Sequence, residues 1–204
     1  MKMPTLILFT GGPGSGKTTL INEFQRQGFS IVPDRARELI RARQLIRGRE
    51  LIRSNHEQRI PSSNMPPKTI NVEQMVGRFF EICLHDYRRY LIKRQQHSII
   101  FFDMGVLEAA ATLIQSASSI ANMKQTNIMK IISTIQFDAV FLFPPWADIY
   151  VQDRERQHSF QHAQNVYQQL CQWYSQLGIQ PLTIPKTNVT ERVQFVLDNL
   201  PIKL

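Results

Sequence analysis

The sequence predicts an α/β fold with a parallel sheet of roughly five strands between two layers of helices. Short apolar runs alternate along the chain with amphipathic segments of helical period. The first run leads directly into a glycine-rich turn, and an acidic residue follows two later runs, at Asp34 and Asp103. Because the carboxyl ends of parallel strands meet at one edge of a sheet, we expect the turn and both acids to lie close together.

The predicted elements follow from apolar periodicity and from the residues that end each segment. Strands are predicted at residues 5–10, 29–32, 98–103, 139–143 and 180–184. Helices are predicted at residues 17–27, 35–47, 72–94, 105–121, 123–135, 166–177 and 189–200. Asn188 and Glu191 resemble an N-terminal cap pair for the last helix. Prolines at 54–70 indicate a long loop, and Pro144-Pro145 opens a predicted lid segment at 144–162.

Length and composition bound the class of protein. The chain has 204 residues, 43% of them hydrophobic, which suffices for one core and predicts a single domain across residues 1–204. Its early apolar run is too short for a secretory or membrane-spanning segment. Cys83 and Cys171 suggest neither a disulfide framework nor a metal knuckle. These features predict a cytoplasmic protein with reduced thiols and no transmembrane segment.

The positive charge is concentrated in one segment. The formal net charge is +8, and residues 35–59 contribute +5 of it, with eight arginines and three glutamates. Such a stretch attracts anionic partners, although a solvated helix face is the more common meaning of a charge run. We do not expect a nucleic-acid partner, whereas an anionic lipid or protein partner at 35–59 stays open.

Residues 11–18 match the phosphate-binding pattern G-x-x-x-x-G-K-[ST], the P-loop, in full. Glycines let the backbone turn so that amides around 14–19 form an anion-sized nest, and the following helix adds the positive end of its dipole. Lys17 can reach the β- and γ-phosphates of a nucleoside triphosphate. The predicted nucleotide-binding residues are Gly11, Gly12, Pro13, Gly14, Ser15, Gly16, Lys17, Thr18 and Thr19.

Two acids at strand ends are the predicted partners of the P-loop. Asp103 closes a buried run, where its carboxylate can hold Mg²⁺ together with the Thr18 hydroxyl. The alternative role for Asp103 is to cap the next helix. Asp34 can accept a proton from a substrate hydroxyl, and it can equally cap the helix that follows it.

Arginines of the predicted lid complete the list of catalytic candidates. Arg154 and Arg156 can stabilise negative charge on a transferred phosphoryl group, as can Arg35 or Arg37. For each arginine alone, a solvated charged helix is the simpler reading. Because Arg154 and Arg156 lie together in a segment that follows a strand and a proline break, we expect these two to act on the phosphates.

Six sequence blocks resemble the NadR-like AAA-domain family of small P-loop ATPase/kinase-like proteins. In chain order they are FTGGPGSGKTTLI, VPDRARELI, IIFFDMG, VFLFPPW, QDRERQHSFQHA and TERVQFVLDNL. The resemblance implies a P-loop NTPase fold, a three-layer α/β/α sandwich with the first strand central and a helical lid. It also implies a phosphate role for residues 11–18, a metal role for Asp103, and a lid role for Asp153, Glu155, Arg156 and Phe160.

Two positions depart from the pattern of this family. Relatives often have Asp-Arg-Gly after the third strand, whereas this chain has Asp103-Met104-Gly105. The chain therefore lacks an arginine that can contact substrate or phosphate at this point. Relatives often have Glu after the second strand, and Asp34 keeps that carboxylate on a shorter side chain.

Two functions from different classes follow. The leading hypothesis is an enzyme that moves the γ-phosphoryl of ATP or GTP, with Mg²⁺, to a small hydroxyl-bearing acceptor such as a nucleoside or nucleotide. The alternative is a nucleotide-switched ATPase- or GTPase-like protein with weak hydrolysis that engages an anionic lipid or protein. Met104 and the arginine-rich segment favour the alternative. No N-K-x-D motif is present, so ATP is the default nucleotide.

Overall fold

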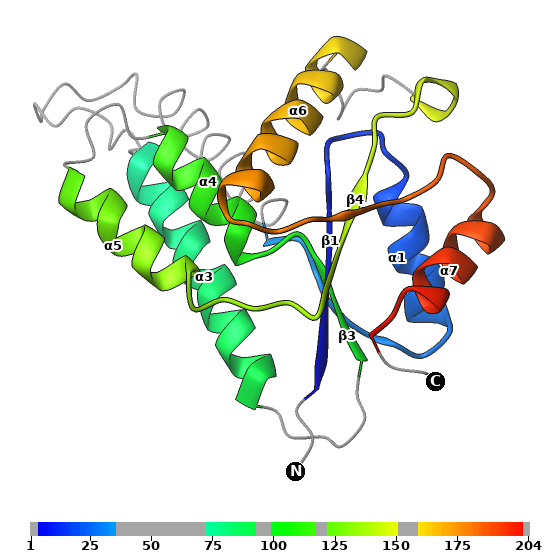
Figure 1. Ribbon diagram of the computed structural model, residues 1–204, viewed down its shortest axis with the longest axis horizontal. Coiled ribbons are helices and arrows are strands. Elements are labelled where there is room, and N and C mark those ends of the chain that lie inside the picture. The colour runs from blue at the N-terminus through cyan, green and yellow to red at the C-terminus, as the bar shows by residue number, and fades with distance from the viewer. Residues whose placement is uncertain (1–3, 36–71, 93–98, 117–121, 151–158, 202–204) are drawn as a thin grey trace, which may run out of the picture.

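The computed structural model describes residues 4–35, 72–92, 99–116, 122–150 and 159–201, and its centre is a five-stranded parallel sheet (Figure 1). The strands are β1 (Thr5–Gly11), β2 (Ser30–Val32), β3 (Ile99–Asp103), β4 (Ala139–Phe143) and β5 (Leu182–Thr183). Their spatial order is β2-β3-β1-β4-β5, and all neighbouring pairs are parallel. The first strand is therefore central, as the family resemblance implies.

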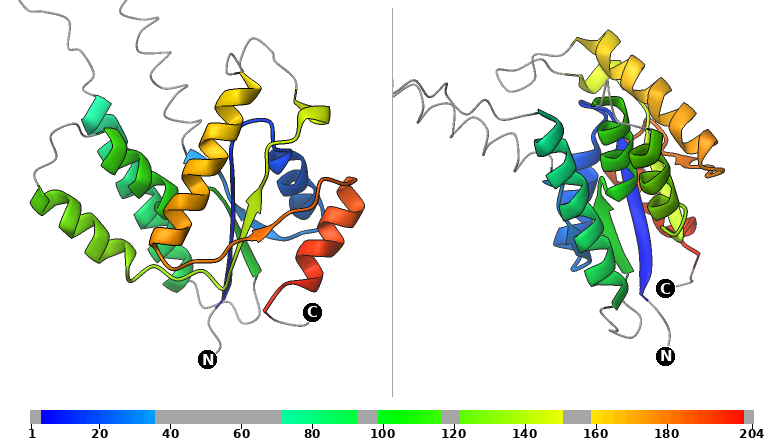
Figure 2. Two further views of the ribbon diagram at one scale, coloured as in Figure 1. Left: turned by 45° about the horizontal axis from the view of Figure 1, so that its top comes forward. Right: turned by 90° about the vertical axis from the view of Figure 1, so that its left-hand side faces the viewer.

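Helices cover both faces of the sheet (Figures 1 and 2). One face is covered by α1 (Lys17–Arg26) and α7 (Val189–Asp198), which contact each other. The other face is covered by α3 (Val72–Ile92), α4 (Val106–Ser116), α5 (Asn122–Ile132) and α6 (Phe160–Gln176). A short 3-10 turn, η1 (Ala147–Ile149), follows β4. The predicted three-layer α/β/α sandwich of the P-loop NTPase type is confirmed.

Strand β1 shows why both faces need helices. Its Leu6 and Leu8 pack in the core beneath α3 to α6, while Ile7 and Phe9 pack in the core beneath α1 and α7. Successive side chains of a strand point to opposite faces, so a strand apolar throughout must be covered twice. Four rings lie 5.0–5.7 Å from the Phe9 ring between centroids, namely Phe24, Phe101, Phe141 and Phe143. This aromatic cluster fixes α1 against the sheet.

Within the described residues most predicted boundaries agree closely with the structure, and two elements differ clearly. Strand β5 has two residues instead of the predicted 180–184, because it is an edge strand that pairs only with β4. Helix α6 begins at Phe160, earlier than the predicted residue 166. Ser159 Oγ accepts a hydrogen bond from the His162 amide at 3.2 Å, and this cap starts the helix within a polar stretch. The predicted cap of the last helix is confirmed, since Asn188 Oδ1 accepts from the Glu191 amide at 2.9 Å.

Several predicted segments lie outside the described residues. These are the helix at 35–47 beyond Arg35, the loop at 54–70, and the lid residues 151–158. The predicted helix ends at 94 and 121 and the predicted strand start at 98 also lie outside them. Within the described helices, none combines the length and the apolar character that crossing a bilayer requires.

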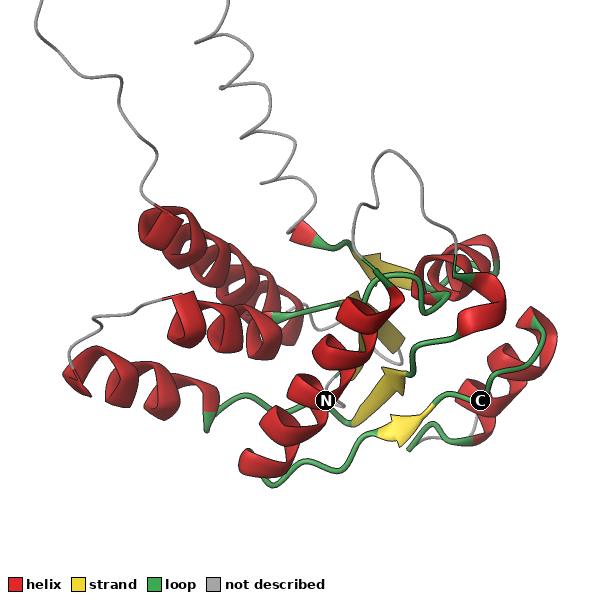
Figure 3. Ribbon diagram, turned by 90° about the horizontal axis from the view of Figure 1, so that it is seen from above, coloured by secondary structure: helices red, strands yellow, loops and turns green. Residues whose placement is uncertain are grey.

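The strand register brings the chemistry-bearing residues to one edge of the sheet. Figure 3 shows the sheet and its surrounding helices from above. Asp103 of β3 lies opposite Phe9 of β1, and Gly11 of β1 lies opposite Phe143 of β4. The carboxyl ends of these three strands are therefore level with one another. Asp34 follows β2 closely and reaches the same edge, as the sequence predicts for an open parallel sheet.

Candidate functional site

The loop between β1 and α1 has the conformation of an anion-binding nest. Gly14 and Gly16 adopt φ values of 74° and 76°, a left-handed region that favours glycine. Ser15 Oγ donates to the Gly12 carbonyl at 2.9 Å and braces the turn. Gly16 caps α1, and no acidic residue lies in the first turn of that helix. The loop amides and the positive end of the helix dipole thus provide a site for phosphate.

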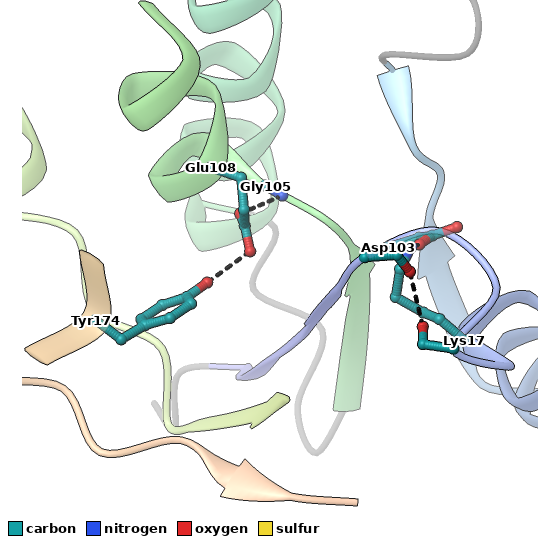
Figure 4. A network of polar contacts seen from close by, with 7 residues as sticks. Lys17, Asp103, Gly105, Glu108 and Tyr174 are labelled. Carbon is teal, nitrogen blue, oxygen red and sulfur yellow. Dashed lines mark hydrogen bonds and ion pairs between the residues drawn. The ribbon is translucent and has the colours of Figure 1, made fainter. Parts of the chain in front are cut away.

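Lys17 and Asp103 form a buried ion pair at this edge (Figure 4). Lys17 Nζ donates to Asp103 Oδ1, and the two residues are only 7% and 8% exposed. Lys17 begins α1 and Asp103 ends β3, so the adjacent strands β1 and β3 bring them together. Each charge needs the other, because an unpaired buried charge is strongly destabilising. The sequence predicted both residues as site residues, and they are in contact.

Thr18 and Asp103 fit the requirements of Mg²⁺ bound through phosphates. Mg²⁺ in phosphate sites keeps several waters and takes only one or two protein oxygens. Thr18 lies in the first turn of α1, next to Lys17, and Asp103 faces the same loop. No group of three His, Cys, Asp or Glu side chains with metal-binding geometry is found in the described part of the chain. A phosphate-dependent Mg²⁺ site does not need such a group.

The turn after Asp103 is held by hydrogen bonds from two backbone amides. Met104 adopts a φ of 61°, which is uncommon for a residue with a side chain. Its amide donates to the Phe9 carbonyl at 2.9 Å and continues the β1–β3 pairing beyond the strand. The Gly105 amide donates to Glu108 Oε2 at 2.9 Å. These bonds fix the backbone on the far side of Asp103 and help to direct its carboxylate toward Lys17.

Glu108 is a buried acid that the sequence analysis missed. It lies on α4, is 2% exposed, and accepts a hydrogen bond from Tyr174 Oη of α6 at 2.5 Å (Figure 4). Burial raises the pKa of this carboxyl, and its hydrogen bonds with Tyr174 and the Gly105 amide act in the opposite direction. The signal in the sequence was an acid inside the apolar run VLEAAATLI. Glu108 ties the turn after β3 to α6.

A second group of charges lies where α3 approaches the site edge. Asp34 is half-buried just beyond β2. Arg35 Nε donates to Asp86 Oδ2 of α3 at 2.8 Å, so Arg35 forms an ion pair with a buried acid. The pKa of the Cys83 thiol is raised by burial first, and further by the charges of Glu108, Asp86 and Asp34. Asp86 was missed, although an acid on the apolar stripe of a predicted helix was a visible signal.

The described start of the predicted lid packs against the phosphate loop. A Cβ added at Gly14 would lie 2.4 Å from the Tyr150 ring, so this ring lies directly on the loop. The Tyr150 ring also meets the Phe160 ring edge-on at 5.3 Å, which joins the loop to the start of α6. Arg154 and Arg156, and the lid residues Asp153 and Glu155 with them, lie outside the described residues.

The fold, the phosphate loop and the Lys17–Asp103 pair define a P-loop protein of the class that comprises kinase-like phosphotransferases and ATPases. A family profile described as "AAA domain" matches residues 6–192, which is most of the chain. The chain belongs to this AAA-domain family. Its resemblance to NadR-like members is confirmed by the structural comparisons.

Solved structures share the fold at low sequence identity. NadR in complex with NR has a TM-score of 0.66 and 13% identity over 98% of this chain and 52% of the NadR chain. NadR in complex with NAD and AMP-PNP has a TM-score of 0.64 and 12% identity over 98% of this chain and 51% of the NadR chain. Deoxyadenosine kinase from M. mycoides with bound dATP has a TM-score of 0.53 and 12% identity over 95% of this chain and 97% of the kinase chain. The chain thus spans about half the length of NadR, and no curated protein matches it significantly.

Proposed function

We propose that this chain binds a nucleoside triphosphate with Mg²⁺, ATP by default, and transfers its γ-phosphoryl group to a small hydroxyl-bearing acceptor such as a nucleoside or nucleotide. The observation that carries the proposal is the buried pairing of Lys17 with Asp103 beside the phosphate loop. The fold likeness to a NadR structure with AMP-PNP and to a deoxyadenosine kinase supports the class of both substrates.

Lys17 and Asp103 are suited to exchange partners when nucleotide binds. A phosphate group in the nest can replace the Asp103 carboxylate as the partner of Lys17 Nζ. The released carboxylate, with Thr18, can then hold Mg²⁺, which when bound would neutralise negative charge on the phosphate oxygens. Before nucleotide binds, the ion pair thus leaves neither buried charge without a partner.

Asp34 is the proposed general base. Its carboxylate accepts the proton of the acceptor hydroxyl while the hydroxyl oxygen forms a bond to the γ-phosphorus. The bond between that phosphorus and the β–γ bridging oxygen breaks, and the nucleoside diphosphate leaves with the electron pair of that bond. Lys17 stabilises the β- and γ-phosphate oxygens, and Arg154 and Arg156 are proposed to contribute further positive charge.

The test is production of nucleoside diphosphate from Mg·ATP or Mg·GTP, alone and with a panel of nucleosides, nucleotides and sugars. We expect one acceptor class to raise turnover well above the basal rate. Lys17→Ala should lower turnover about 100-fold or more, because it removes the cation that stabilises the β- and γ-phosphate oxygens. Asp34→Asn should lower turnover while nucleotide binding stays close to that of the wild type.

The matched control is Lys130→Ala, which removes an exposed lysine of α5 far from the loop in sequence and is expected to leave turnover unchanged. Wild-type turnover in both Lys17→Ala and Asp34→Asn would contradict the proposed mechanism. Reduced turnover in Lys17→Ala alone would retain the nucleotide site and remove Asp34 from the base role.

A second function is favoured by Met104, which places an uncharged side chain where the family resemblance indicates an arginine. In this function the chain is a nucleotide-switched binding protein with slow hydrolysis, and the segment 35–59 engages an anionic partner. Nucleotide binding without acceleration by any acceptor would support it. Salt-sensitive, nucleotide-dependent sedimentation with phosphatidylserine vesicles would then identify a lipid rather than a protein partner.

A cytoplasmic location and one domain across residues 1–204 belong to the same proposal. Cys83 and Cys171 are free thiols, which suits a reducing compartment.

A further inference from the structure

Arg192 of α7 is a buried arginine that contacts the back of the phosphate loop. It is 3% exposed, and its Nη2 donates to the Ser15 carbonyl at 3.3 Å. A Cβ added at Gly16 would lie 2.7 Å from Arg192 Nη1, so the guanidinium also lies directly against Gly16. Arg192 therefore touches the two residues that precede Lys17.

Aromatic rings hold this guanidinium in place. Its central carbon lies 5.2 Å from the centre of the Phe143 ring and 5.8 Å from the centre of the Trp146 ring. Phe143 ends β4 and Trp146 follows it, so Arg192 joins α7, the end of β4 and the phosphate loop. Stacking on aromatic faces is a favourable arrangement for a planar, delocalised cation.

The charge of Arg192 has no acidic partner in the described part of the chain. No described carboxylate forms an ion pair with it, and its Nε is buried without a hydrogen-bond partner. Burial lowers the pKa of this guanidinium, yet arginine stays protonated in proteins. A buried cation of this kind is costly unless an anion approaches it. The nearest anion-binding feature is the nest on the other side of the Ser15–Gly16 peptide.

The peptide between Ser15 and Gly16 connects Arg192 to that nest. The peptide is trans and planar, so the Ser15 carbonyl and the Gly16 N–H point in opposite directions. Because Arg192 donates to the carbonyl, the N–H is directed away from Arg192, toward the inner side of the loop. A charged donor on the carbonyl also polarises the peptide and strengthens its N–H as a donor to phosphate.

We propose that Arg192 is a positioning residue of the nucleotide site, which orients and polarises the Ser15–Gly16 peptide for the polyphosphate of a nucleoside di- or triphosphate. This inference rests on the proposed nucleotide-binding function, and it adds a residue from α7 that lies far from the P-loop in sequence. Arg192 acts through the loop backbone and through its charge, and it does not need to touch the reacting atoms.

The test compares the affinity of the wild type and Arg192→Met for Mg·ADP and for adenosine, by calorimetric titration. Methionine keeps an unbranched side chain against Phe143 and Trp146 but removes the donors and the charge. We expect Mg·ADP to bind about tenfold to a hundredfold more weakly, and adenosine affinity to change little, because adenosine has no phosphate. Arg26→Met is the matched control, since Arg26 is an exposed arginine of α1 paired with Glu23.

Three outcomes separate this inference from the proposed function. If the wild type binds no Mg·ADP, or if Lys17→Ala binds it equally well, the proposed nucleotide site fails. If Lys17→Ala loses binding and a folded Arg192→Met keeps it, only the role of Arg192 is overturned. Equal losses for Mg·ADP and adenosine in Arg192→Met would indicate a structural role and would also overturn it.

If Arg192→Met does not fold, Arg192→Lys decides the question. Lysine keeps the charge, but it lacks the planar guanidinium that stacks on Phe143 and at the same time donates to the Ser15 carbonyl. We expect this variant to bind Mg·ADP several-fold more weakly than the wild type, with adenosine affinity retained. Wild-type affinity for Mg·ADP in Arg192→Lys would overturn the positioning role of the guanidinium.

Discussion

Asp103 and Glu108 are both buried acids near the phosphate loop, and different partners compensate them. Asp103 faces the Lys17 ammonium, whereas Glu108 receives hydrogen bonds from neutral donors, Tyr174 Oη and the Gly105 amide. Burial without a cation disfavours the ionised carboxylate, which is why the pKa of Glu108 is raised. Glu108 therefore contributes a pH dependence to stability at the scale of one residue.

For Glu108 we expect stability to decrease as pH rises above the ordinary pKa of 4.5. In that range the folded protein still holds a proton that the unfolded chain has lost, so a rise in pH favours unfolding until the raised pKa is passed. Glu108→Gln mimics the protonated acid and should remove this contribution. The measurement is the free energy of urea unfolding from pH 5 to pH 8, expressed as the difference between variant and wild type.

A leucine variant provides the contrast. Glu108→Leu leaves the Gly105 amide and Tyr174 Oη without their acceptor, so we expect a loss of about 1–3 kcal/mol of unfolding free energy. If the difference between Glu108→Gln and the wild type were the same at every pH, a raised pKa of Glu108 would not be tenable.

Residues of the site differ in how well sequence alone could identify them. Lys17 and Thr18 belong to a fixed motif, and Asp103 closes a strand-like run, so local pattern was enough. Glu108 and Arg192 lie inside amphipathic helices, where a single charged residue is ordinarily taken as solvated. Their burial depends on the neighbouring elements that pack against each helix. The apolar periodicity of one segment does not identify those neighbours. Arg192 in addition acts on a loop at the opposite end of the sequence.

At the scale of elements, the start of α7 determines where Arg192 lies. Asn188 caps this helix through Glu191, and the Arg192 amide donates to the Asn188 carbonyl at 3.1 Å. Asn188→Ala should lower the free energy of unfolding by about 1 kcal/mol, because an orphan amide loses its acceptor. Affinity for Mg·ADP should decrease with it, since the first turn of α7 carries the guanidinium. Urea unfolding and calorimetric titration measure the two effects.

Two controls bracket the Asn188 prediction. Asn188→Asp keeps a capping oxygen and should remain close to the wild type in both measurements. Asn199→Ala removes the Nδ2 donor to the Phe195 carbonyl at the other end of the helix, far from the loop, and should leave Mg·ADP affinity unchanged. An equal loss of affinity in Asn199→Ala would show that general loosening of α7, rather than its first turn, matters.

Element boundaries were predictable where apolar runs meet glycine or proline, and less so where polar residues form the boundary. Strand β4 lies at its predicted position because Pro144 follows it directly. The start of α6 was placed too late, since most residues from Ser159 to Asn165 are polar and the cap geometry reveals the helix. Strand β5 was placed correctly but too long, because edge pairing, which the run itself does not encode, limits its length.

For the molecule as a whole, one sheet supports two apolar cores. The core beneath α3 to α6 and the core beneath α1 and α7 both include residues of β1, β3 and β4. Because loss of the sheet exposes both cores together, we expect a single cooperative unfolding transition. The site lies at the edge of the same sheet, so nucleotide binding should stabilise both cores at once.

The two tryptophans of the sequence offer a probe for each side. Trp173 of α6 packs in the core with α3 and α4 and donates to the Leu107 carbonyl at 3.0 Å, whereas Trp146 lies beside Arg192 near the phosphate loop.

Trp146→Phe and Trp173→Phe each leave one reporter, and their fluorescence in urea can be compared with circular dichroism of the same samples. We expect the two signals to coincide within each variant, and Mg·ADP to change the emission of Trp146 far more than that of Trp173. A Trp146 signal lost at lower urea than the helical signal would mean that the loop side unfolds separately, and the domain would then not be one cooperative unit.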